Sequence, residues 1–181
     1  GRLEEAQRQF ERSFEIQQTG SAASNTGTVL FRRGDFQAAA AWFEKATALS
    51  PQDYRLWRHL GSAYFRAPGQ RDRAPAAYRK ALELAEQERA IDPNDGRVII
   101  DMADCATMLG DRARALTLTA DALKLAPKNS EVHYMAADVY ETLGDRTSAL
   151  RWLEVALRAG YQRTLLETSP SFANLRADPR Y

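Results

Sequence analysis

The chain has 181 residues, of which 44% are hydrophobic and 27% are charged, and its formal net charge is +1. This composition is typical of a folded, helix-rich protein and excludes a disordered chain. The near-neutral charge excludes a general electrostatic attraction to nucleic acid or to a membrane surface. A single cysteine, Cys105, excludes an internal disulfide, and no apolar run approaches the roughly 18 residues that cross a bilayer. We therefore expect a protein of the cytoplasm.

The first segment, residues 1–19, has the pattern of a helix. Ala6, Phe10 and Phe14 recur at intervals of four residues and form one apolar stripe. We interpret this segment as the second helix of a hairpin whose first helix lies upstream, and the sequence as a fragment of a longer protein. An apolar stripe without a partner seeks cover, so we expect a homodimer through Leu3, Phe10 and Phe14.

A spacing of 34 residues recurs along the chain. It separates four pairs of like residues: Gly27 and Gly61, Pro93 and Pro127, Gly110 and Gly144, and Ala122 and Ala156. Fixed spacing of this length is typical of a repeat built from two antiparallel helices. We call the first helix of each repeat the A helix and the second the B helix.

Four repeats follow the first segment. Their expected bounds are 20–53, 54–95, 96–129 and 130–160. We expect A helices at about 21–33, 53–66, 95–109 and 130–143, and B helices at about 36–49, 73–91, 111–125 and 145–158. The second B helix is long because Pro51 and Pro93 are 42 residues apart, which leaves room for an extra heptad. Residues 161–181 break the period, and we expect them to cap the last repeat.

The turn between an A helix and its B helix has a recurring sequence. Gly34-Asp35, Gly110-Asp111 and Gly144-Asp145 occupy equivalent places in three repeats. Glycine adopts the left-handed conformation that ends a helix, and aspartate caps the next one. These pairs therefore predict sharp turns.

One stretch carries a family signature. Residues 57–64 follow the pattern W-x2-L-G-x2-Y, and Ala74, Tyr78 and Ala81 continue it. The chain resembles the tetratricopeptide repeat (TPR) family over nearly its whole length. This resemblance implies an all-α fold, a right-handed superhelix of antiparallel helix hairpins with a C-terminal helical cap. It also implies a non-catalytic scaffold that binds a peptide or partner helix in a concave groove.

A narrower resemblance rests on three stretches, F-R-A-P-G-Q-R-D-R-A, A-Y-R-K-A-L-E-L-A-E-Q-E-R-A-I-D-P-N-D and L-R-A-D-P-R-Y. They are similar to the C-terminal TPR regions of bacterial multidomain signalling proteins, in which a kinase, cyclase or winged-helix domain precedes the repeats. The resemblance implies a regulatory region of a larger bacterial protein. The alternative is a homo-oligomerisation module of a signalling enzyme or transcription regulator.

The A helices line the groove in the family that the chain resembles. The residues expected to face a partner are Asn25, Thr28, Arg32, Arg55, Arg58, His59, Ser62, Phe65, Arg66, Arg97, Asp101, Asp104, Met108, Tyr134, Met135 and Asp138. Charge is segregated around them: residues 54–80 contain seven basic side chains and one acidic one, and residues 81–111 contain eight acidic and two basic ones. Such a groove would orient a charged peptide.

The sequence lacks the residues that other classes of function require. There is no Ser-His-Asp or Cys-His arrangement, phosphate-binding loop or metal-spaced cluster in the sequence, so we expect no enzyme activity, no cofactor and no metal. The basic residues of 54–80 are matched by the acidic block that follows, so we expect no nucleic acid partner. We expect a protein or peptide instead.

Overall fold

A computed structural model of the protein describes residues 2–181. Within this range the chain forms ten α-helices, three short 3-10 helices and no β-strand. The prediction of an all-α helical repeat protein is confirmed. The chain divides into two compact units, Gly1–Leu84 and Ala85–Tyr181. None of the described helices is both long enough and apolar enough to traverse a membrane.

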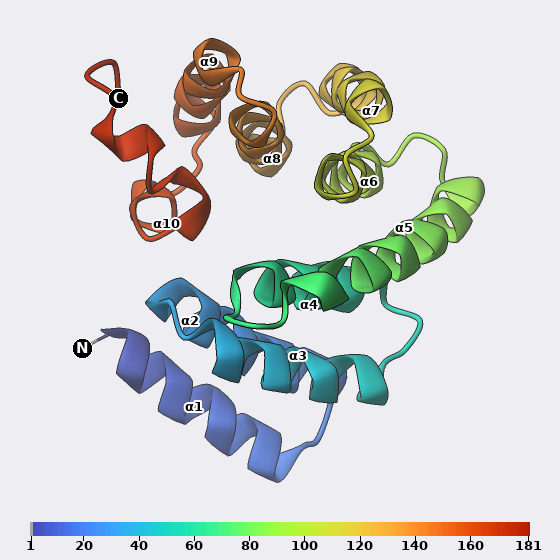
Figure 1. The fold of residues 1–181 in the computed structure, drawn as a ribbon, viewed down its shortest axis with the longest axis vertical. Coiled ribbons are helices and arrows are strands. Elements are labelled where there is room, and N and C mark those ends of the chain that lie inside the picture. Colours follow the sequence, from blue (N-terminus) through green and yellow to red (C-terminus); the bar gives the residue numbers. More distant parts are fainter. Residues whose placement is uncertain (1) are drawn as a thin grey trace. The chain divides into compact units, whose positions relative to one another are not determined.

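The first unit is a stack of consecutive helices. They are α1 (Arg2–Ile16), α2 (Gly20–Arg33), α3 (Phe36–Leu49), α4 (Tyr54–Arg66), the 3-10 helix η1 (Arg71–Arg73) and the start of α5 (Ala74–Ile91). α2 packs against both α1 and its hairpin partner α3, and α3 in turn packs against α4. Figure 1 shows these helices together. Ala23, Ala46 and Leu56 form a buried cluster, against which Phe14 and Trp42 pack.

The second unit repeats the hairpin twice and ends in a short cap. Its helices are α6 (Gly96–Met108), α7 (Arg112–Leu125), α8 (Ser130–Thr142), α9 (Arg146–Arg158) and α10 (Arg163–Glu167), followed by the 3-10 helices η2 (Pro170–Phe172) and η3 (Leu175–Ala177). The pairs α6–α7 and α8–α9 are antiparallel hairpins (Figure 1). In the cap, Leu166, Phe172 and Leu175 are fully buried, and Leu153 of α9 packs in the same cluster.

The turns within the hairpins have the conformation that the sequence predicts. Gly34 has φ +85°, and Gly110 and Gly144 have nearly the same value. In the first of these turns Asp35 accepts a hydrogen bond from the backbone N–H of Ala38. A left-handed residue favours glycine because other residues pay a steric cost there, and the aspartate satisfies a free N–H of the next helix. Local sequence therefore determines where each hairpin turns.

Glycines also allow helices to approach closely. A Cβ on Gly27 of α2 would lie 2.8 Å from the ring of Phe43 on α3, and a Cβ on Gly61 of α4 would lie 3.0 Å from the ring of Tyr78 on α5. Both rings are buried. In these two repeats a glycine of the A helix therefore receives an aromatic ring of the B helix, which gives the close packing of a protein interior.

The long B helix differs slightly from its expected start. It was expected from residue 73, but Arg71–Arg73 form a 3-10 turn and α5 begins at Ala74 and ends at Ile91. Pro75 explains the start, because proline lacks the N–H of an interior helical residue and is tolerated only in the first turn. At the other end α5 stops at Ile91, and its 18 residues exceed the 14 of α3 and of α7.

Candidate partner-binding surfaces

The A helices of the first unit are basic. Neither α2 nor α4 contains an acidic residue, and together they carry five arginines. We define the basic helix surface as the accessible predicted side chains of these two helices: Asn25, Thr28, Arg32, Arg55, His59, Ser62, Phe65 and Arg66. Asn25 and Arg55 are exposed and the others are half-buried. Arg58, also predicted to face a partner, is 9% exposed and contributes little accessible surface.

Polar contacts connect the two helices of the basic helix surface. The Nδ1 atom of His59 lies 3.4 Å from the Ser24 hydroxyl of α2, and its Nε2 atom lies 3.3 Å from a guanidinium nitrogen of Arg58. The Ser62 hydroxyl donates to the carbonyl of Arg58 and accepts a hydrogen bond from the Tyr78 hydroxyl. These side chains are held in place before any partner binds, which reduces the entropy lost on binding.

Aromatic rings hold the guanidinium group of Arg66 at the C-terminal end of α4. The guanidinium of Arg66 lies 5.9 Å from the ring centroid of Phe31 and 5.8 Å from that of Phe36. Arg71 lies over Phe65 at 4.2 Å in the same way. A ring face attracts a cation without neutralising its charge. These contacts hold the guanidinium groups of Arg66 and Arg71 beside the aromatic rings.

Arg55 has a local role at the start of α4. It forms two hydrogen bonds of 2.9 and 3.0 Å with the carboxylate of Asp53, which caps the helix. Partial burial raises the pKa of Asp53, but the hydrogen bonds and charge of Arg55 outweigh it and leave that pKa below its usual value. The positive charge of Arg55 is thus largely neutralised by Asp53.

The A helices of the second unit are acidic. Together α6 and α8 contain five carboxylates and one arginine, Arg97. Arg97 forms ion pairs with Asp101, at 3.3 Å, and with Glu131. We define the acidic helix surface as the half-buried predicted side chains of these helices: Arg97, Asp104, Met108, Tyr134 and Asp138. The remaining predicted residues, Asp101 and Met135, are buried.

Tyr134 is already engaged by the C-terminal segment. Its ring stacks on Tyr161 with centroids 4.4 Å apart and meets the ring of Phe172 edge-on at 5.4 Å. Its hydroxyl lies 2.8 Å from the hydroxyl of Ser169. Tyr134 therefore anchors the cap to α8, a role that the repeat pattern did not reveal because the cap lies outside the period.

The apolar stripe of α1 is partly covered within the chain. The ring of Phe14 packs edge-on against Trp42 of α3, with centroids 5.1 Å apart. Leu3, Phe10 and Phe14 are all half-buried. The stripe leaves less apolar surface for a second copy than the sequence alone indicated, and the most exposed apolar side chain of α1 is Ile16.

His133 is buried beside α9 and predicts a pH dependence. Its ring is 3% exposed and stacks on Trp152 at 5.4 Å. Burial lowers the pKa of His133 below 6.5, and a hydrogen bond with the backbone of Pro127 opposes this only in part. Since the unfolded chain binds the proton first, the free energy of unfolding should fall as pH drops below about 6.5, until the folded form is protonated as well.

Urea denaturation between pH 5 and 8 measures this effect. The variant His133→Phe should lose part of the decline below pH 6.5. An identical pH dependence in the two proteins would show that His133 does not contribute.

Metal-ligating side chains do not cluster among the described residues. No group of three histidine, cysteine, aspartate or glutamate side chains within residues 2–181 could hold a metal ion. Cys105 is 1% exposed and is therefore shielded from reagents in solution. The surfaces above offer charged, hydrogen-bonding and aromatic groups, which suit recognition of another chain.

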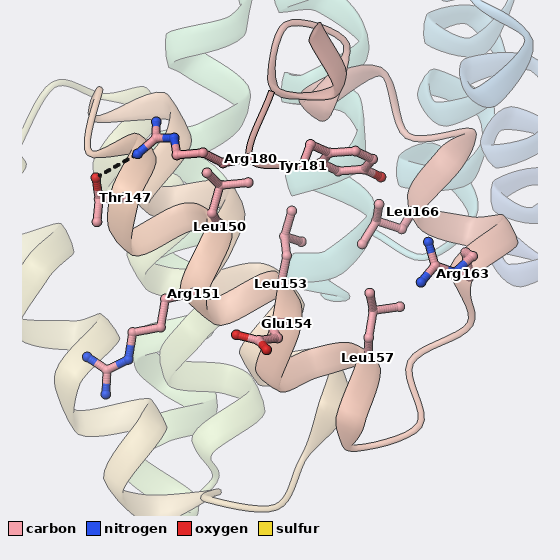
Figure 2. A pocket seen from close by; sticks show the side chains of 10 residues that line it. All are labelled: Thr147, Leu150, Arg151, Leu153, Glu154, Leu157, Arg163, Leu166, Arg180 and Tyr181. Carbon is pink, nitrogen blue, oxygen red and sulfur yellow. Dashed lines mark hydrogen bonds between the residues drawn. The ribbon is translucent and has the colours of Figure 1, made fainter. Parts of the chain in front are cut away.

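A pocket beside α9 was not predicted from the sequence. Leu150, Arg151 and Leu157 of α9, with residues of the C-terminal segment, line a pocket of about 530 Å³ (Figure 2). The helical spacing of the leucines was a signal for an apolar stripe. The other wall belongs to the segment that breaks the repeat period, so the sequence could not place it opposite α9.

Comparison with protein families and solved structures gives consistent results. Two family models described as tetratricopeptide repeat match the chain, one over residues 1–54 and 25–89 and the other over residues 108–177. The chain is similar to TTC0263, a thermophilic TPR protein of Thermus thermophilus, with 20% identity and a TM-score of 0.63 over 95% of this chain and 91% of that one.

A second solved structure, MamA 41-end from Desulfovibrio magneticus RS-1, has 19% identity and a TM-score of 0.50 over 88% of this chain and 86% of that one. No curated protein matches the chain. The structural likenesses show the fold, and the family models cover most of the sequence. The chain belongs to the tetratricopeptide repeat family.

Proposed function

We propose that the chain is a non-catalytic protein–protein interaction scaffold that binds a peptide or partner helix on its A helices. The observation that carries this proposal is the basic helix surface, in which two adjacent helices display arginine, histidine and amide side chains and contain no carboxylate. TPR proteins are generally scaffolds of this kind, which supports the proposal. The partner segment that suits this surface is acidic.

The acidic helix surface of the second unit suits a segment of the opposite charge. Asp104 and Asp138 are its half-buried carboxylates, and Arg97 is already paired with Asp101 and Glu131. Complementary charges accelerate encounter and select partners more than they deepen affinity. The two surfaces would therefore discriminate between acidic and basic segments of a partner.

A binding experiment with charged peptides tests the proposal. The probe is a labelled extended peptide in which glutamate alternates with leucine, and its counterpart carries lysine in place of glutamate. Fluorescence anisotropy with the full chain should show tighter binding of the acidic peptide to the wild type. The variant Arg32→Gln/Arg66→Gln should weaken that binding by roughly fivefold to tenfold, since each lost charge contact is worth up to about 1 kcal/mol.

The matched control removes two positive charges elsewhere in the same unit. Lys45 and Arg79 are exposed on the B helices α3 and α5. The variant Lys45→Gln/Arg79→Gln should retain wild-type affinity for the acidic peptide. Equal loss in both double variants would mean that net charge, rather than the basic helix surface, governs binding.

A second candidate function is self-association, with the chain as a homo-oligomerisation module of a signalling enzyme or transcription regulator. It is favoured by the half-buried Leu3, Phe10 and Phe14 of α1. Light scattering on a size-exclusion column, with the wild type and Phe10→Glu, distinguishes the two functions. A dimer that the substitution splits supports self-association, and a monomer in both proteins rejects it. For the interaction scaffold, we further propose from the resemblance to bacterial signalling proteins that it is a regulatory region of a larger bacterial protein.

A further inference from the structure

The pocket on α9 has an apolar floor. Leu150, Leu153 and Leu157 of α9 and Leu166 of α10 line it, and Figure 2 shows Tyr181 on the side opposite α9. Leu153 and Leu166 are buried, while Leu150 and Leu157 are half-buried. The pocket of about 530 Å³ is therefore a recess that would bury large apolar side chains of an incoming group.

Two of the charged residues that line the pocket are neutralised within the chain. Arg180 forms hydrogen bonds of 3.0 and 2.9 Å with the carboxylate of Asp178, and these bonds lower the pKa of Asp178 to about 2. Glu154 forms an ion pair of 2.5 Å with Arg158. The charges of Arg180 and Glu154 therefore have partners.

The other two charged residues that line the pocket are Arg151 and Arg163. Within residues 2–181, no carboxylate forms an ion pair with either of them. Arg151 lies 5.5 Å from the ring of Trp152, a contact that leaves its charge in place. Figure 2 shows the leucines between Arg151 on one side and Arg163 on the other. The pocket thus combines an apolar floor with two arginines that form no ion pair among the residues that the structure describes.

The shape of the lining favours a helix as the occupant. Thr147, Leu150, Arg151, Glu154 and Leu157 follow the spacing i, i+3, i+4, i+7 and i+10, which is one face of α9. This face extends about 15 Å along the axis, at 1.5 Å per residue. Earlier B helices are covered by the next repeat, since α3 packs against α4 and α7 against α8. The residues that follow α9 form the five-residue α10 and two 3-10 turns, and Leu150 and Leu157 of α9 are half-buried beside them.

We propose that this pocket is the docking site of an acidic amphipathic helix from a partner protein. Its apolar face would lie on Leu150 and Leu157, and carboxylates beside that face would pair with Arg151 and Arg163. A helix that lies in an apolar groove inserts side chains at its own positions i, i+3, i+4 and i+7. The site is made of α9 and the C-terminal segment and is independent of the A-helix surfaces, so it would serve a second partner segment.

Binding of a model helix tests this proposal. The probe is a labelled helical peptide with leucines on one face and glutamates beside them, and its counterpart carries lysines in place of the glutamates. The acidic helix should bind the full chain, and Arg151→Glu/Arg163→Glu should weaken it by about tenfold or more, because two attractive contacts become repulsive. The lysine helix should bind the double variant better than it binds the wild type.

The control variant changes the net charge by the same amount elsewhere in the unit. Lys124 and Lys128 are exposed and do not line the pocket. Lys124→Glu/Lys128→Glu should bind the acidic helix as the wild type does. The loss caused by Arg151→Glu/Arg163→Glu should persist when these substitutions are added to Arg32→Gln/Arg66→Gln, in which the basic helix surface is weakened. In methyl NMR spectra, binding of the acidic helix should shift the signals of Leu150, Leu157 and Leu166.

Four results would overturn the proposal. The first is equal binding of the acidic and basic helices, and the second is equal loss of binding in the control variant. The third is binding of dodecanoate to the pocket without binding of the acidic helix. The fourth is self-association of the chain through the same leucines without binding of the acidic helix. The first two would remove the role of Arg151 and Arg163. The third would assign the pocket to a small anionic amphiphile, and the fourth to a second copy of the chain. None of these results bears on binding to the basic helix surface.

Discussion

Replacing Phe172 with alanine should lower the free energy of unfolding of the second unit by about 3–5 kcal/mol, the usual cost of deleting a buried phenylalanine ring. The side chain is fully buried in the cluster with Leu153, Leu166 and Leu175. It also meets Tyr134 edge-on, so its loss opens a cavity between the cap and α8. Hydrogen exchange of the α8 and α9 amides measures the local loss directly, without requiring that both units unfold together.

Tyr181 provides the matched control for this prediction. It belongs to the same C-terminal segment and has a ring of similar size, but it is 43% exposed. Tyr181→Ala should change the free energy of unfolding by less than about 1 kcal/mol, because half-exposed side chains bury little surface. A similar loss in both variants would mean that the cap is not packed around Phe172.

Gly27→Leu should destabilise the first unit by about 1–3 kcal/mol or more, the range for adding side-chain volume to a packed interior. Even a single Cβ on Gly27 would lie 2.8 Å from the ring of Phe43, so a leucine forces α2 and α3 apart. The gain in helix propensity over glycine, at most about 1 kcal/mol, does not offset this cost. Urea denaturation followed by circular dichroism measures the change.

A double-mutant cycle identifies the cause of this loss. If the clash with the ring is responsible, Gly27→Leu/Phe43→Ala should be less destabilised than the sum of the single variants by roughly 0.5–3 kcal/mol. Asn25→Leu, on an exposed position of the same helix, should change stability by no more than about 0.5 kcal/mol. Strict additivity in the cycle would exclude a direct clash between positions 27 and 43.

Much of the fold follows from local sequence. The pairs Gly34-Asp35, Gly110-Asp111 and Gly144-Asp145 predict the hairpin turns because each residue type satisfies a local requirement, one for a left-handed backbone and one for a free N–H. The spacing of Pro51 and Pro93 predicts the long α5 in the same way. These features depend on few residues, close together in the chain.

The sequence predicted the candidate surfaces less well than it predicted the fold. A repeat position indicates the face of a helix on which a side chain begins, but it does not reveal how far neighbouring groups cover that side chain. Arg58, Asp101 and Met135 were all predicted to face a partner, and all three are buried. Tyr134 is covered by Tyr161 and Phe172, which lie in a segment without a repeat pattern.

The same reason explains why the pocket on α9 was not predicted. Arg151 lies on a B helix, whose outward residues have no assigned role in the pattern, and Arg163 lies beyond the last repeat. Within the part of the chain that the structure describes, neither arginine has an ion-pair partner, and this is a property of the folded chain. Such sites emerge only when the neighbours of each charge are known.

The measurement that tests the interaction scaffold most directly is a map of backbone amide shifts of the full chain during titration with the acidic extended peptide. Binding as proposed should shift amides of α2 and α4, at and beside Asn25, His59 and Arg66, and leave those of α6 and α8 unchanged. The absence of any saturable shift, or shifts confined to α3 and α5, would contradict the proposal that the A helices of the first unit bind the partner.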